Sequence, residues 1–138
     1  MFMSKEQNMA TQEKLGAAAT SGDFDAFDEV FAEHVVDHDP APDQGPGPEG
    51  FKGFFKSLGA AFPDAGIEVE HVVQDEDNVA IAYTLTGTHD GEFQGVAPTG
   101  KKIKVRGMQI ARFEDGKIVE RWGATDELSI MRQLGAVS

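Results

Sequence analysis

The hydrophobic pattern between Lys101 and Gly135 limits the possible folds more than any other part of this sequence. Apolar and polar residues alternate on both sides of the tetrapeptide EDGK at 114–117, as in strands with one buried face. The Asp-Gly pair inside that tetrapeptide favours a tight hairpin turn. From Asp126 onward the apolar period lengthens to about 3.6 residues, which predicts a short helix. We therefore expect a β-hairpin followed by a helix, and a chemical site should be sought here first.

The preceding part of the chain predicts three helices and two further strands. An alanine-rich segment to about Thr20, the apolar stripe of residues 24–31 and the i, i+3, i+4 pattern of residues 51–62 each indicate a helix. Period-two segments over residues 67–74 and 79–89 indicate strands. Because neither face of the second strand is strongly charged, it should lie centrally in its sheet with both faces covered. These elements predict an α+β domain whose N-terminal helices pack on the concave face of a curved antiparallel sheet.

Length and composition favour a small protein that works inside the cell. The 138 residues predict a single domain spanning 1–138, with residues 1–8 flexible. Without cysteine, the chain has no disulfide, no thiolate nucleophile and no cysteine-ligated metal centre. The net charge of -12 repels nucleic acid and an anionic membrane surface. No apolar segment is long enough to cross a bilayer and no secretory signal is recognisable, so we expect a cytoplasmic protein that binds neither nucleic acid nor membrane.

The segment between Lys14 and Lys52 contains acidic residues but no Lys or Arg. Such a segment is most simply a solvated acidic face that aids solubility. The alternative is a cation site built from four neighbouring residues, Asp37, His38, Asp39 and Asp43. The prolines around them fit a loop but not the glycine-turned spacing of a calcium-binding loop, and we predict no bound metal.

Several segments of the sequence resemble one known family. SnoaL-like polyketide cyclases (ester cyclase type) of the NTF2-like superfamily are similar to this chain in the run GTHDGEFQGVAPTGKKIKVRGMQIARFEDGKIVERWGATD at 87–126, and in MRQLG at 131–135, VVDHDP at 35–40 and AAFPD at 60–64. The resemblance implies a cone-shaped NTF2-like fold, commonly a homodimer, with an apolar pocket and no metal or organic cofactor. The best-known members close a ring of an aromatic polyketide ester by intramolecular aldol condensation.

Two positions depart from the chemistry that the resemblance implies. The aldol cyclases use an aspartate on the last strand as the acid/base and a histidine on the preceding strand, and the matching positions here hold Gly123 and Gln109. Glycine has no side chain to accept a proton, and glutamine is not a base near neutral pH. The resemblance therefore predicts the fold, but an aldol cyclase reaction does not follow from it.

Asp126 and His89 are the candidate catalytic bases. Asp126 either faces the pocket as a carboxylate base or serves as the N-cap of the following helix, since it lies where the strand pattern becomes helical. His89 lies at the end of an apolar strand face, before a loop expected to rim the pocket, and imidazole titrates near neutral pH. Its alternative role is structural, with the ring bonded to a neighbouring strand or loop.

Five further residues are predicted to contact a small ligand: Gln109, Trp122, His38, Asp37 and Tyr83. With a two-residue turn, strict alternation places Trp122 opposite Gln109, and a bulge near Gly123 would change this register. There an aromatic wall and an amide suit a planar oxygenated ligand, with core packing of Trp122 as the alternative. Asp37 and His38 are expected to end the second helix region near the pocket mouth, and Tyr83 shares a strand face with His89.

Three arginines, Arg106, Arg112 and Arg121, share one strand parity in this pattern. That parity is expected to place them on the outer face of the sheet. Ion pairs at a dimer interface are their favoured role there, with anion binding as the alternative.

We therefore expect an enzyme that transfers a proton on a carbonyl-bearing cyclic or aromatic metabolite, by cyclase-like lyase or isomerase chemistry without a cofactor. Asp126 or His89 would be the base. The alternatives are a non-catalytic small-molecule binding protein and a dimerisation module whose cone is filled by Phe and Trp side chains. The expected partners are a small apolar or aromatic oxygenated ligand and a second copy of the chain in a homodimer.

Overall fold

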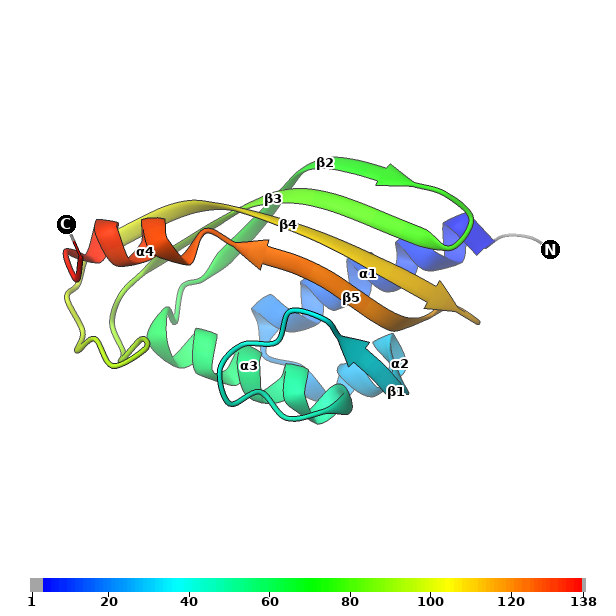
Figure 1. Ribbon diagram of the computed structural model, residues 1–138, viewed down its shortest axis with the longest axis horizontal. Helices are drawn as coiled ribbons and strands as arrows, with labels where there is room; N and C mark the ends of the chain where they lie inside the picture. Colours follow the sequence, from blue (N-terminus) through cyan, green and yellow to red (C-terminus); the bar gives the residue numbers. More distant parts are fainter. Residues whose placement is uncertain (1–3, 138) are drawn as a thin grey trace.

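Five strands form one curved sheet that arches over two longer helices (Figure 1). The computed structural model describes residues 4–137. In chain order the elements are α1 (Ser4–Ser21), η1 (Phe24–Ala26), α2 (Phe27–Val30), β1 (Phe31–Asp37), α3 (Gly47–Ala61), β2 (Gly66–Gln74), β3 (Asn78–Thr88), β4 (Lys102–Glu114), β5 (Lys117–Thr125) and α4 (Glu127–Leu134). The strand order is β1-β5-β4-β3-β2, and α1 and α3 lie below the concave face. The predicted α+β architecture is confirmed.

The predicted hairpin and C-terminal helix are also confirmed. Asp115 and Gly116 join β4 to β5 with φ of 51° and 77°. Two successive residues in the left-handed region make a two-residue turn whose twist matches that of the flanking strands. α4 follows Asp126 and ends at Gly135, which has a left-handed φ of 80°.

The strand β1 corrects the prediction of a helix over residues 24–31. The helical turns end at Val30, and Phe31 begins an extended strand that pairs in parallel with β5. The β-branched pair Val35 and Val36 favours this conformation. Asp37 therefore ends a strand rather than a helix, and it lies beside β5.

β3 is an interior strand of the sheet, as predicted, although β4 is the middle one of the five. β3 lies between β2 and β4 and buries alternate residues, among them Val79, Ile81 and Leu85, on the concave face. Its other face carries Ala and Thr side chains that are mostly half-buried. Short neutral side chains such as these tolerate partial exposure to solvent, so a strand face without charged residues need not be covered. The prediction that both faces of β3 are covered is therefore wrong.

One extra residue in β5 breaks the pairing that counting from the turn predicts. Phe113 pairs with Ile118, but Arg112 pairs with Glu120. Val119 is therefore a β-bulge, with two residues of β5 opposing one of β4. Both Ile118 and Val119 are buried, so the bulge is held in the core.

Beyond the bulge, the residues of β5 exchange faces relative to the prediction. Gln109 pairs with Gly123, and Ile110 pairs with Trp122, so the predicted pairing of Trp122 with Gln109 is wrong by one residue. Because side chains alternate with a period of two, a one-residue shift reverses the face of each. Arg121 consequently points to the concave side, contrary to the prediction that it lies on the outer face.

The first helix begins inside the segment that was expected to be flexible. The side chain of Asn8 is buried and donates a hydrogen bond to the backbone oxygen of Glu76 at 3.1 Å. Residues 4–8 therefore belong to α1, while residues 1–3 lie outside the described part of the chain, and the flexibility of residues 1–8 stays a prediction. Within residues 4–137, no helix is both long enough and apolar enough to cross a membrane.

Asp64, two residues before β2, is hydrogen-bonded to the end of β3. Its carboxylate accepts hydrogen bonds from the backbone N–H of Thr88 at 2.6 Å and from the Thr88 hydroxyl at 2.8 Å. Both hydrogen bonds lower the pKa of Asp64 below its usual range, and the bond from the backbone N–H has the larger effect. The carboxylate thereby stabilises the fold at pH values above its unfolded pKa, and this contribution is lost as the pH falls through the folded pKa.

We accordingly predict that Asp64→Asn reduces the acid sensitivity of the fold. The loss in urea midpoint between about pH 7 and about pH 3 should be smaller in this variant than in the wild type. Asp25→Asn is the control, because Asp25 is exposed and its carboxylate has no hydrogen-bond partner within residues 4–137. An equal loss of midpoint in wild type and Asp64→Asn would contradict the prediction.

Candidate functional site

A cavity lies between the concave face of the sheet and the helices α1 and α3. Its larger part has a volume of about 420 Å³ and an adjoining part about 310 Å³. The two parts share lining residues, including Gln109, Arg121, Thr125 and Glu127, and so adjoin each other. The larger part is mainly apolar, with Phe54, Phe55, Leu58, Ile67, Ile81, Leu85 and Ile130 in its wall. An apolar lining with a few polar groups is typical of a small-molecule site.

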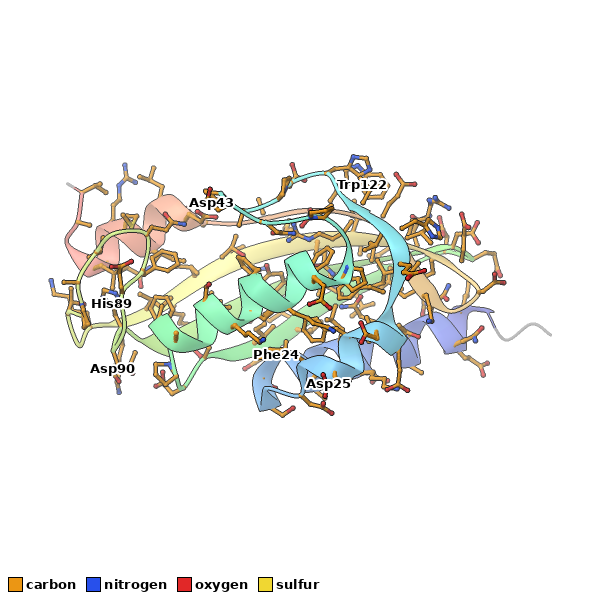
Figure 2. The ribbon with its side chains drawn as sticks, turned by 90° about the horizontal axis from the view of Figure 1, so that it is seen from below. Phe24, Asp25, Asp43, His89, Asp90 and Trp122 are labelled. Atoms are coloured by element: carbon orange, nitrogen blue, oxygen red, sulfur yellow. The ribbon has the colours of Figure 1, made fainter. Side chains whose placement is uncertain are left out.

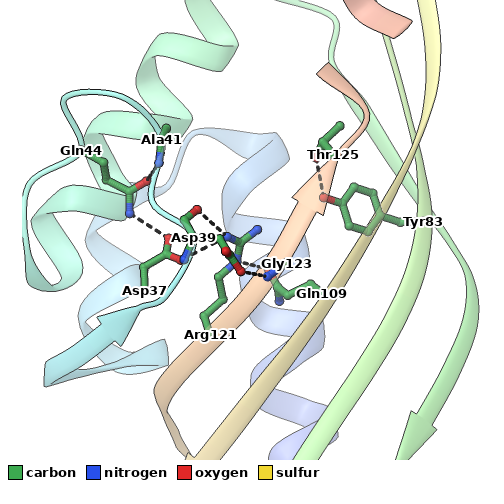
Figure 3. Close-up of polar contacts among 9 residues, drawn as sticks. All are labelled: Asp37, Asp39, Ala41, Gln44, Tyr83, Gln109, Arg121, Gly123 and Thr125. Atoms are coloured by element: carbon green, nitrogen blue, oxygen red, sulfur yellow. Dashed lines mark hydrogen bonds and ion pairs between the residues drawn. The ribbon is translucent and has the colours of Figure 1, made fainter. Parts of the chain in front are cut away.

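An ion pair joins the end of β1 to the middle of β5 at the cavity wall (Figure 3). Arg121 Nη1 lies 3.2 Å from Asp37 Oδ1, and the two side chains are only 15% and 7% exposed. Arg121 Nε also donates to Gln109 Oε1 at 3.2 Å, and Gln44 donates to the second oxygen of Asp37 at 2.9 Å. The parallel pairing of β1 with β5 creates this contact, because it sets Asp37 directly beside Arg121. The predictions that Gln109 and Asp37 lie at the pocket are consistent with this geometry.

Asp39 brings a second carboxylate to the same place. β1 ends at Asp37, so the backbone N–H of Gly123 on β5 has no strand partner there, and Asp39 Oδ2 accepts from it at 2.9 Å. The other oxygen, Asp39 Oδ1, has no hydrogen-bond partner within residues 4–137. Asp39 lines the cavity, and the sequence considered it only as a cation ligand.

Glycine at position 123 leaves room for the guanidinium of Arg121. A Cβ at this position would stand 3.0 Å from Arg121 Nη2 and 2.6 Å from the backbone oxygen of Met108. Arg121 Nη2 and Gln109 Nε2 each have no hydrogen-bond partner among the described residues. A carboxylate oxygen, a guanidinium nitrogen and an amide nitrogen therefore remain available around Gly123.

Tyr83 reaches across β4 to β5. Its hydroxyl lies 2.8 Å from Thr125 Oγ1, and both residues line the larger part of the cavity. The ring lies over Gly107, where the Cβ of any other residue would collide with it. Tyr83 thus provides a polar group in an apolar wall, in agreement with its predicted position at the pocket.

The structure places Asp126 at the start of α4, where its carboxylate caps the helix. Oδ1 accepts from the backbone N–H of Ser129 at 3.0 Å. Asp126 is not among the residues that line the cavity, whereas its neighbours Thr125 and Glu127 are. The geometry therefore supports the capping alternative, and it does not bring Asp126 to the site.

His89 is fully buried away from the cavity lining. Its Nδ1 accepts from the backbone N–H of Thr99 at 3.2 Å and lies 2.9 Å from the Thr99 hydroxyl, while Phe62 packs on the ring at 5.6 Å between centroids. Its Nε2 has no partner within residues 4–137. These contacts hold the loop after β3 and do not direct the imidazole to the cavity.

Trp122 and His38 lie together on the outer side of the sheet. Their rings stack at 4.7 Å with an interplanar angle of 8°, and neither residue lines the cavity. His38 Nε2 lies 2.8 Å from Glu120 Oε2. This hydrogen bond, and to a smaller extent the one from Arg112, lowers the pKa of Glu120. Figure 2 shows Trp122 and His89 far apart along the long axis of the molecule. The bulge at Val119 explains why Trp122 faces outward.

The alternative of a cation site in the acidic segment has no support in the geometry. Within residues 4–137 no group of three His, Asp or Glu side chains is placed to hold a metal ion. Asp37 and Asp39 instead bind Arg121, Gln44 and the backbone of Gly123.

The fold and the cavity define a class of protein, the small cone-shaped domains that enclose a cavity under a curved sheet. A family model described as SnoaL-like polyketide cyclase matches residues 10–134. This chain belongs to that family, and the resemblance in its sequence is confirmed. A comparison with curated proteins found no match.

Solved structures of similar chains support the same assignment. IdmH from Streptomyces antibioticus, a candidate polyketide cyclase, is 36% identical over 94% of this chain and 99% of its own, with a TM-score of 0.81. AclR from Streptomyces galilaeus, a candidate hydroxylase, is 28% identical over 96% and 98%, with a TM-score of 0.83. TsrD from Streptomyces laurentii shares the fold at 24% identity over 96% and 97%, with a TM-score of 0.87. Neighbours with different described activities show that this fold does not determine the reaction.

Proposed function

We propose that this protein catalyses proton transfer on a carbonyl-bearing cyclic or aromatic metabolite, without a cofactor, and that Asp39 is its base. The supporting observation is the polar group around Gly123, where the free Asp39 Oδ1 lies beside Arg121 and Gln109 in the wall of an apolar cavity. Family membership supports the cyclase-like class of reaction. Asp39 replaces Asp126 and His89 in this proposal because neither of those residues lines the cavity.

The proposed chemistry uses three neighbouring groups. Asp39 Oδ1 removes a proton from the carbon next to the substrate carbonyl, and the electron pair moves to the carbonyl oxygen to give an enolate. Arg121 Nη2 and Gln109 Nε2 donate hydrogen bonds to that oxygen, where negative charge develops. Because the ion pair with Asp37 holds the Arg121 side chain in place, these donors need little reorganisation during the reaction.

An exchange experiment tests this proposal without knowledge of the natural substrate. 2-Tetralone and 1-indanone are bicyclic ketones small enough for the cavity, and each has acidic protons beside its carbonyl. In deuterium oxide, the protein should accelerate deuterium incorporation at that carbon, followed by proton NMR. Binding of both ketones without any acceleration over buffer would contradict catalysis.

The alternative, a protein that binds such a molecule without transforming it, is favoured by one observation. Asp39 accepts a hydrogen bond from the Gly123 N–H, which would otherwise have no partner at this edge of β5. This structural role explains the position of Asp39 without any catalytic activity. The exchange experiment separates the two functions. A dimerisation module with a filled cone is less well supported, because the cavity has room for a ligand.

We also propose that the protein forms a homodimer through the outer face of its sheet. In-register rows cross this face and contain exposed apolar side chains, among them Val73, Met108 and Ile110 at 58%, 58% and 45% exposure. Arg106 and Arg112 lie on either side of these rows in ion pairs with glutamates, which agrees with their predicted place. An exposed apolar patch with a charged border is typical of an interface.

Ile110→Lys tests the proposed dimer. A charge in the middle of the apolar rows should convert a dimer into a monomer, measured by sedimentation velocity. Lys104→Ala, which changes an exposed position nearer the end of the same strand, should leave the dimer intact. A monomeric wild type would contradict the proposal.

A further inference from the structure

Charge at the cavity is strongly unbalanced. Among residues 4–137, four carboxylates line its two parts, from Glu13, Asp37, Asp39 and Glu127, and the single basic residue in their linings is Arg121. The whole chain carries a net charge of -12, so the surrounding field has the same sign. A ligand that enters therefore meets a negative potential.

The guanidinium of Arg121 does not reverse this potential. Asp37 pairs with it at 3.2 Å and offsets its charge, which leaves Asp39, Glu13 and Glu127 without a cationic partner among the described residues that line the cavity. Glu127 Oε2 accepts from the neutral amide of Gln94 at 2.8 Å, while Oε1 has no hydrogen-bond partner within residues 4–137. The carboxylate of Glu13 on α1 likewise has no hydrogen-bond partner within residues 4–137. Both glutamates line the larger, mainly apolar part of the cavity.

We propose that the cavity selects a cationic ligand, an apolar ring system that carries an ammonium group, and that Glu13 and Glu127 bind this ammonium. The apolar wall binds the rings, and the unpaired carboxylate oxygens accept from the N–H groups. An anionic ligand with the same rings is repelled. This inference rests on the proposed function only in its use of the cavity as a ligand site, since it concerns binding and not the proton-transfer step.

Three matched probes test the selection at about pH 7: 2-naphthylmethylamine, 2-naphthylmethanol and 2-naphthoate, measured by calorimetric titration. They share one ring system and differ in charge. We expect the amine to bind about three- to tenfold more tightly than the alcohol, and the carboxylate more weakly than both. The advantage of the amine should shrink as salt is added, because both glutamates are exposed to solvent.

Glu13→Gln combined with Glu127→Gln should abolish the advantage of the amine while the affinity for 2-naphthylmethanol persists. Glu76→Gln is the control at a side chain that is 76% exposed in the β2–β3 turn, and it should retain the advantage. Equal affinities of the wild type for amine and alcohol would overturn the charge selection but leave the ligand cavity intact. Failure of all three probes to bind would overturn both the selection and the use of the cavity as a ligand site.

Discussion

Asp39→Asn lowers the rate of deuterium incorporation into 2-tetralone by about 10²- to 10⁴-fold, the usual contribution of a general base. Asparagine keeps the size of the side chain and an oxygen to accept from the Gly123 N–H, but it cannot take a proton. The bond that joins the β1–α3 loop to β5 is therefore retained while the proposed base is removed. Affinity for the ketone, measured separately, should change little, because the loss lies in the reaction step.

Asp126→Asn is the matched control for this variant. Asparagine is as good an N-cap as aspartate, so α4 should remain stable, and the carboxylate it removes does not line the cavity. The exchange rate of Asp126→Asn should stay close to that of the wild type. If Asp126→Asn loses the activity and Asp39→Asn keeps it, the base is the residue predicted from the sequence and our assignment from the cavity is wrong.

Arg121→Met destabilises the protein by about 3 kcal/mol, the cost of leaving one member of a buried ion pair alone. The carboxylate of Asp37 is only 7% exposed, so water cannot replace the guanidinium without a change in structure. Methionine keeps much of the arginine stem, which limits the loss of packing. The free energy of unfolding can be measured by urea denaturation monitored through the fluorescence of Trp122.

Two comparisons separate the ion pair from the general effect of removing an arginine. Arg106→Met removes a surface pair with Glu70 in which both side chains are at least 40% exposed, and it should cost about 0–1 kcal/mol. Asp37→Asn combined with Arg121→Met should recover part of the stability lost in Arg121→Met, because no unpaired charge remains. Equal losses in Arg121→Met and Arg106→Met would contradict a buried pair.

Most of the fold followed from local patterns in the sequence. The hairpin, its Asp-Gly turn and the helix after Asp126 depend on residues close together in the chain, and the structure has all of them. The strand β1 did not follow, because its seven residues come directly after two apolar helical turns and their pairing partner lies far along the chain. Its two adjacent valines, Val35 and Val36, were the available sign of a strand.

The site was harder to predict because it depends on contacts between distant residues. Asp39 lies 84 positions before Gly123, and no spacing in the sequence relates them. Tyr83, Gln109 and Asp37 were predicted to contact a ligand, and all three line the cavity, but the contact with a ligand stays a prediction. Arg121 was assigned to the wrong face because alternation was counted through a strand that contains a bulge.

That bulge also has a genetic consequence. Removal of Val119 alone would shorten β5 by one residue and restore unbroken alternation from the turn onward. The residues after the bulge would keep their partners, so Arg121 would still pair with Ala111 on the concave side and Trp122 with Ile110 on the outer side. A deletion of one codon at this point would thus remove a buried valine and the bulge, while the cation stays in the cavity wall and the indole ring stays outside.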